Sequence, residues 1–118
     1  MPTSTIFWMR SSLTPALRMA EVRVSAAARR DLERISAEGV RDYGADASER
    51  HIEGFRRLFR LLRDHPFAGQ DWPELELGVR TMSHRPHCIV YRVEGDTVLI
   101  DRILHQARDI GRAIRDDQ

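Results

Sequence analysis

The sequence predicts an α+β domain in which a helical hairpin packs on a small antiparallel sheet, in the order β-α-α-β-β-β. Residues 79–105 contain three short runs rich in Val, Ile, Leu and Tyr, separated by polar turns at 83–86 and 94–96. This is the pattern of two consecutive β-hairpins. Upstream, residues 25–65 carry two apolar stripes at helical spacing. Two amphipathic helices and a small sheet can bury their apolar faces against each other.

The first strand and the first helix follow one another closely. Val22 and Val24 alternate with charged residues, and this two-residue period predicts a short strand. Ser25 is a good N-cap for the helix that follows, and Gly44 is a good residue to end it. The stripe between them recurs every three or four residues and consists of Ala28, Leu32, Ile35, Gly39 and Tyr43.

A second helix is predicted directly after Gly44. Asp46 and Glu49 have the D-x-x-E spacing of a capping box, and Pro66 ends the helix. Its stripe consists of Ile52, Phe55, Phe59 and Leu62. Because only one or two residues join the two helices, they form an antiparallel hairpin, whose apolar face covers the sheet.

The remaining elements are the strands of the sheet. Residues 67–78 are expected to be an irregular connection, since Gly69, Pro73 and Gly78 interrupt them. The run 87–93 is apolar on both faces apart from His87 and Arg92, as expected for the central strand. Residues after His105 have the spacing for one or two helical turns.

Length and composition predict a single domain. The 118 residues suffice for a single core, with 19–118 as the domain and 1–18 as a dispensable N-terminal extension. The apolar run at 6–9 is too short for a membrane span. Nineteen basic residues, all arginine, against 18 acidic ones argue against bulk electrostatic binding of nucleic acid. Cys88, the single cysteine, is expected to be a buried apolar residue.

The last two strands carry a family resemblance. PHCIVYRV, a short turn and then TVLIDRILHQARD match the pattern H-x-[IV]-x-Y-R-V followed by V-x-[IL]-x-R-[IV]-L-H. This pattern resembles the C-terminal half of the ParE branch of the RelE/ParE toxin superfamily, which includes plasmid stabilisation proteins. The resemblance extends back through VRVSAAARRDLERI to about Met19 and leaves only the first 18 residues outside it.

The resemblance implies a cytoplasmic toxin of a type II toxin-antitoxin module. Such a protein would inhibit DNA gyrase by binding it, and a ParD-like ribbon-helix-helix antitoxin would neutralise it. It would need no catalytic residue, cofactor, metal or membrane, and it would bind no specific nucleic acid sequence itself.

A ribosome-dependent mRNA endoribonuclease of the RelE or YoeB type is the alternative. This chemistry needs a general base, cations and an acid that converge on the sheet. The candidates are Arg80, Arg85, Tyr91, Arg102 and His105. Cys88 and Gln106 stand where the ribonucleases carry arginine and tyrosine, and both departures weaken this alternative. A third possibility is an inactive toxin homologue that acts only as an interaction partner.

Arginines on the second helix and near the C-terminus are the candidate partner-binding residues, although a solvated helix face is the simpler interpretation of the helical ones. They are Arg56, Arg57, Arg60, Arg63, Arg108 and Arg112. His84 and His87 have the spacing of a metal-binding pair, but the sequence offers no third ligand. The metal, redox, phosphate-loop and serine-hydrolase motifs H-E-x-x-H, C-x-x-C, G-x-x-x-x-G-K-[ST] and G-x-S-x-G are absent.

Overall fold

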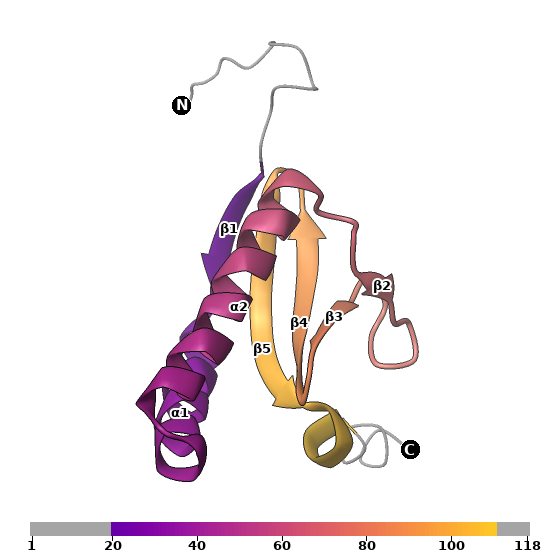
Figure 1. The fold of residues 1–118 in the computed structure, drawn as a ribbon. Helices are drawn as coiled ribbons and strands as arrows, with labels where there is room; N and C mark the ends of the chain where they lie inside the picture. Colours follow the sequence, from indigo (N-terminus) through magenta and orange to yellow (C-terminus); the bar gives the residue numbers. More distant parts are fainter. Residues whose placement is uncertain (1–19, 111–118) are drawn as a thin grey trace.

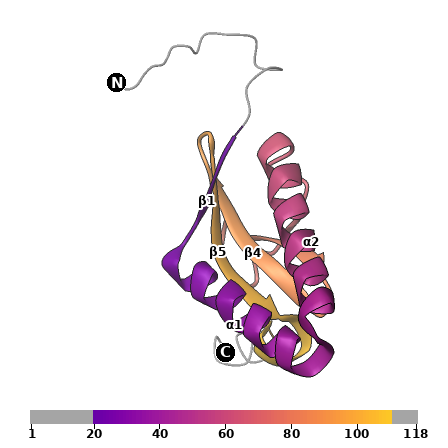
Figure 2. The ribbon, with the colours of Figure 1, turned by 60° about the vertical axis from the view of Figure 1, so that its left-hand side comes forward.

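A helical hairpin lies against one face of a five-stranded sheet (Figures 1 and 2). The computed structural model describes residues 20–110. Its elements are β1 (Glu21–Val24), α1 (Ala26–Tyr43), α2 (Ala45–Asp64), β2 (Gln70–Asp71), β3 (Arg80–His84), β4 (His87–Glu94), β5 (Thr97–His105) and a π-helical turn, η3 (Gln106–Ile110). The predicted fold class is confirmed. Neither α1 nor α2 is long and apolar enough to cross a membrane.

The sheet differs from the expectation at both of its edges. Its strand order is β1-β5-β4-β3-β2, and β4 lies in the centre as predicted. The two hairpins are antiparallel, but β1 pairs with β5 in parallel, so the sheet is mixed. The connection expected to be irregular contributes the two-residue strand β2, which pairs with the start of β3.

The two helices are joined by Gly44 alone. The N-cap prediction is confirmed, because the Ser25 hydroxyl accepts a hydrogen bond from the Ala28 N–H at 2.9 Å. Gly44 has a φ of 93°, a left-handed conformation that glycine adopts without strain. The predicted capping box is wrong: α2 begins at Ala45, before Asp46, and no side chain caps it. Asp46 lies in the first turn, where its negative charge interacts favourably with the positive end of the helix dipole.

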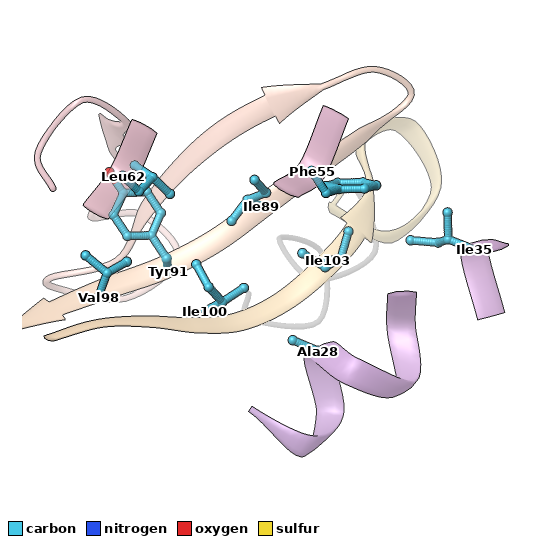
Figure 3. Packing of buried hydrophobic residues seen from close by; sticks show 9 residues of the cluster. All are labelled: Ala28, Ile35, Phe55, Leu62, Ile89, Tyr91, Val98, Ile100 and Ile103. Carbon is cyan, nitrogen blue, oxygen red and sulfur yellow. The ribbon is translucent and has the colours of Figure 1, made fainter. Parts of the chain in front are cut away.

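The main core lies between the hairpin and the sheet (Figure 3). Phe55 and Leu62 of α2 pack with Ile89 and Tyr91 of the central strand, and the whole buried set is Ala28, Ile35, Phe55, Leu62, Ile89, Tyr91, Val98, Ile100 and Ile103. Both predicted stripes supply this core, except for Gly39, which lies against Ser48, and Tyr43, which is 79% exposed. Tyr43 is the last residue of α1, at the hairpin tip, which extends past the end of the sheet (Figure 1).

A smaller core covers the opposite face of the sheet. Side chains alternate across a strand, so Cys88 and Val90 point away from the helices. They are buried with Val79 against Leu75 and Leu104. The central strand is therefore covered on both faces, and the prediction of a buried Cys88 is confirmed. Burial raises the pKa of the Cys88 thiol to about 11, so it is not a reactive thiolate at neutral pH.

The start of α1 covers the edge of β5 where β1 ends. Val24, the last residue of β1, pairs with Ile100, and β5 continues for five more residues. The Ser25 hydroxyl donates to the Asp101 carbonyl at 2.8 Å, and the Ile103 N–H donates to the Asp31 carboxylate at 2.9 Å. These bonds pair backbone groups that β1 is too short to reach.

Candidate functional site

Arg80 and Tyr91, two of the candidate nuclease residues, hold the corner of the chain that follows α2. Tyr91 is fully buried; its hydroxyl donates to the Pro66 carbonyl at 2.8 Å and accepts from the Gly69 N–H at 2.9 Å. The Arg80 guanidinium donates to the carbonyls of Gly69 at 3.0 Å and Phe67 at 3.3 Å. The Tyr91 hydroxyl and the Nη2 atom of Arg80 therefore both bind backbone groups of this corner.

Arg102, the third candidate, forms an ion pair with Asp31 of α1. Its Nε and Nη2 atoms donate to the two carboxylate oxygens of Asp31 at 2.8 and 3.0 Å. Asp31 is only 4% exposed. Burial raises the pKa of its carboxyl, but the bonds from Arg102 and the Ile103 N–H outweigh burial and hold the pKa below its ordinary value. Asp31 is thus a buried carboxylate whose partners complete the edge of β5.

His105 does not converge with the other candidates. It pairs with His87, whereas Arg80 pairs with Tyr91, four residues further along β4. Four residues of strand span about 13 Å. Arg85 lies exposed in the turn between β3 and β4. The structure therefore does not bring His105 together with Arg80 and Tyr91.

Four of the five histidines instead meet between α2 and the strand ends. His51 stacks on His84 with ring centroids 4.3 Å apart, and its Nε2 lies 3.0 Å from Nδ1 of His87. Nε2 of His84 lies 2.9 Å from the His51 carbonyl, so it is the donor of that bond. His105 meets His87 edge to face at 5.7 Å. We call His51, His84, His87 and His105 the histidine cluster.

Two imidazoles of the histidine cluster, His51 and His87, are neutral at pH 7 because the pKa of each is lowered. Burial lowers the pKa of His87 to about 4, and the nearby His51, His105 and His84 rings oppose its protonation further. Burial, followed by the charge that His84 can take up, also lowers the pKa of His51. The contact between His51 and His87 needs one nitrogen that donates and one that accepts, which two neutral imidazoles provide. Among residues 20–110, no group of three or more His, Cys, Asp or Glu side chains is arranged to hold a metal ion.

A pocket of about 360 Å³ opens beside this cluster at the hairpin tip. Both apolar and polar side chains line it, and they come from four parts of the chain. The lining residues are Ile35, Glu38, Gly39, Asp42 and Tyr43 of α1; Ala47, Ser48 and His51 of α2; Pro86 and His87 around the β3–β4 turn; and His105 and Arg108 at the end of β5. Gly39 lies against Ser48, whose hydroxyl donates to the Ser36 carbonyl at 2.8 Å. This close approach of the two helices fixes one wall of the pocket.

The predicted partner-binding arginines of α2 are mostly paired on their own helix. Arg56 contacts Glu53 at 3.0 Å and Glu49 at 3.4 Å, and Arg60 contacts Glu53 at 3.3 Å. Arg63 contacts Asp64 at 3.3 Å. Arg57 is exposed and has no polar partner among the described residues. Such exposed pairs cost little to break, so these cations can exchange partners.

The other two predicted partner-binding residues lie at the C-terminal end. Arg108 lines the pocket, its backbone N–H donates to Nδ1 of His105 at 3.2 Å, and its side chain lies 3.7 Å from Asp109. Arg112 lies outside the described residues. The structure brings Arg108 to the histidine cluster and separates it from the α2 arginines.

Sequence reasoning missed the histidine cluster, although part of it could have been found. His84 and His87 flank a tight turn, so hairpin pairing alone sets them opposite each other. His105 pairs with His87 only because β5 contains one extra residue: Val90 pairs with Arg102, whereas Tyr91 pairs with Ile100. No pattern in the sequence predicts this β-bulge.

A family model, similar proteins and solved structures all relate this chain to ParE toxins. The family model for the ParE toxin of the type II toxin-antitoxin system parDE matches residues 22–110. Toxin ParE3 of Caulobacter vibrioides is 31% identical over 74 residues, which cover 63% of this chain and 74% of the relative. Toxin ParE1 of Mycobacterium tuberculosis is 30% identical over 90 residues, which cover 75% of this chain and 92% of the relative.

Solved structures share the fold. The chromosomal ParDE toxin-antitoxin system from P. aeruginosa contains a chain that superposes with a TM-score of 0.65 at 24% identity, covering 74% of this chain and 96% of that one. The RelBE2 toxin-antitoxin complex from Mycobacterium tuberculosis gives a TM-score of 0.58 at 22% identity, covering 74% and 98%. Because the family model spans nearly all the described residues, the chain belongs to the ParE toxin family of type II toxin-antitoxin systems.

Proposed function

We propose that this protein is the toxin of a type II toxin-antitoxin module, that it acts in the cytoplasm by binding DNA gyrase, and that a ParD-like ribbon-helix-helix antitoxin neutralises it. The observation that carries the choice of binding over catalysis is the engagement of Arg80, Tyr91 and Arg102 in structural contacts. A nuclease would need such groups free and converging on one phosphate.

The test measures two activities of the same preparation. We expect the purified protein to inhibit gyrase supercoiling or to increase gyrase-dependent DNA cleavage complexes. Protein that has first been saturated with its antitoxin is the matched control and should do neither. Codon-specific cleavage of mRNA on the ribosome, with gyrase unaffected, would instead support the endoribonuclease. A protein that binds an antitoxin but shows neither activity would be an inactive homologue.

The antitoxin is expected to bind along the helical hairpin. A disordered tail that folds on binding can bury apolar anchors beside the hairpin while its acidic side chains meet arginines at the rim. The proposed rim residues are Arg56, Arg57, Arg60, Arg63, Arg108 and Arg112. Arg57 needs no rearrangement to accept an acid, whereas Arg56 and Arg60 must share or leave Glu53.

Rate measurements over a salt series test this assignment. Rim charges steer association, and exposed pairs contribute under about 1 kcal/mol each. Replacing Arg56, Arg57, Arg60 and Arg63 by glutamine should therefore slow association and flatten its salt dependence while changing dissociation little. Replacing Arg29 and Arg30, which are exposed on α1, is the control and should have a smaller effect. A hundredfold faster dissociation with an unchanged association rate would contradict the rim assignment.

A further inference from the structure

We propose that the pocket at the hairpin tip binds the guanidinium group of one arginine side chain presented by a protein partner. The identification of that partner as the antitoxin rests on the proposed function, whereas the site itself rests on the pocket. At this pocket the partner supplies the positive charge, whereas at the arginines of α2 the partner supplies the negative charge.

The size of the pocket limits what can enter it. A volume of about 360 Å³ is near the lower end of the roughly 300–1,000 Å³ found for small-ligand sites. A single long side chain fits this space, and a helix or strand does not. The pocket is open at the hairpin tip, beside the exposed ring of Tyr43, so a side chain can enter from a partner lying over α1.

The carboxylates of the pocket favour a cation. Glu38 and Asp42 lie one turn apart on α1, and both line the pocket. Their ion pairs on the helix surface are long, at 3.8 Å to Arg34 and 3.9 Å to Arg41, so both groups keep the capacity to accept hydrogen bonds. A phosphate or an acidic side chain would meet two negative charges here, with Arg108 as the single cation of the lining and Asp109 beside it.

The imidazoles favour a planar cation. His51, His87 and His105 also line the pocket. Burial lowers the pKa of His51 and of His87, so these two imidazoles are neutral at pH 7. Neutral aromatic faces stack on guanidinium, whose edge carries donors that match a carboxylate. An ammonium group is a compact point charge that cannot use the faces and the carboxylates together. Arginine is therefore preferred over lysine.

The histidines provide the measurement. Nα-acetyl-arginine N-methylamide is titrated into the full chain while the imidazole C–H signals of all five histidines are followed by NMR. We expect saturable shifts of His51, His87 and His105. His65 is exposed at the opposite end of α2, so its signal should not move and serves as the internal control. The corresponding citrulline and lysine derivatives should bind at least fivefold more weakly.

Two sets of variants make the result specific. The double substitution Glu38→Gln with Asp42→Asn keeps the shape of both side chains and should weaken arginine binding at least tenfold. Glu33→Gln, an exposed acid elsewhere on α1, should leave it unchanged. Equal binding of citrulline, equal movement of His65, or unchanged binding by the double variant would each overturn the proposal. The free probe requires no antitoxin and no gyrase, so this result is independent of the proposed function.

Discussion

The half-buried imidazole of His87 makes the stability of the fold depend on pH. Burial lowers its pKa from the ordinary 6.5 to about 4, and the pKa of His51 is lowered for the same reason. Between pH 6.5 and about 4, His87 is protonated in the unfolded chain but stays neutral in the folded chain. The stability that His87 contributes in its neutral form is therefore fully present above pH 6.5, and it is lost as the pH falls from 6.5 to about 4.

We expect the free energy of unfolding to fall by about 2 kcal/mol between pH 7 and pH 4 through His87, after allowance for solvent screening. Urea denaturation at a series of pH values measures it. His87→Gln should flatten this part of the profile, and His65→Gln, the exposed control, should leave it unchanged. A profile that stays equally steep without His87 would place the titrating group elsewhere.

Tyr91 is expected to matter for stability through its hydroxyl alone. Tyr91→Phe keeps the ring in the core but leaves the buried Gly69 N–H without an acceptor. An unsatisfied buried donor costs about 1–3 kcal/mol, so the denaturation midpoint should fall while the spectrum of the folded state is retained. Any toxic activity measured below that midpoint should survive. Abolished activity in a fully folded Tyr91→Phe protein would restore Tyr91 as a catalytic candidate.

The contacts made by three candidate residues of the nuclease alternative could not be predicted from the sequence, and the reason is the same for all three. Arg80, Tyr91 and Arg102 are polar side chains on strands, and the sequence cannot tell whether their polar atoms face a substrate or a backbone carbonyl. Their partners Gly69, Pro66 and Asp31 lie 11, 25 and 71 positions away. Local patterns identify the residue type, whereas the partner depends on the three-dimensional packing.

At the scale of elements, both helices and the last three strands follow from periodicity and turn residues. The errors occur where one element constrains its neighbour. The capping box failed because a single glycine joins the helices and α2 starts before Asp46. The parallel pairing of β1 could not be read from its four residues, since their alternation suits either direction.

Gly54 of helix α2 lies directly against the His84 ring of β3. Glycine to alanine in an exposed helix normally stabilises by about 1 kcal/mol. Here an added Cβ would overlap the His84 ring, which is held by its bond to the His51 carbonyl. We expect Gly54→Ala to destabilise the protein by about 1–3 kcal/mol in thermal or urea denaturation.

A double-mutant cycle separates this overlap from a general effect on the helix. In a His84→Ala background the obstacle is gone, so Gly54→Ala should become neutral or stabilising. If the loss is as large in that background as in the parent, the ring contact is not its cause.

For the whole molecule, the first 18 residues are predicted to be dispensable. They lie outside the described residues, and the family match begins at residue 22. A chain beginning at Met19 should melt within a few degrees of the full chain and bind the antitoxin with unchanged affinity. A large loss of either would show that the apolar run at 6–9 packs on the domain.

The parallel pairing of β1 with β5 also has a consequence for how the protein is made. A hydrogen bond where these strands meet joins Ser25 to Asp101, 76 positions later in the chain. β1 therefore cannot pair until β5 has left the ribosome. During that interval the helical hairpin lacks the part of its core that β5 supplies, which is Val98, Ile100 and Ile103. Contacts of such long range form slowly, and nascent chains that expose apolar surface are prone to aggregate. An N-terminal translation fragment that stops before β5 would therefore be unable to complete the fold, because β5 lies between β1 and β4 in the sheet.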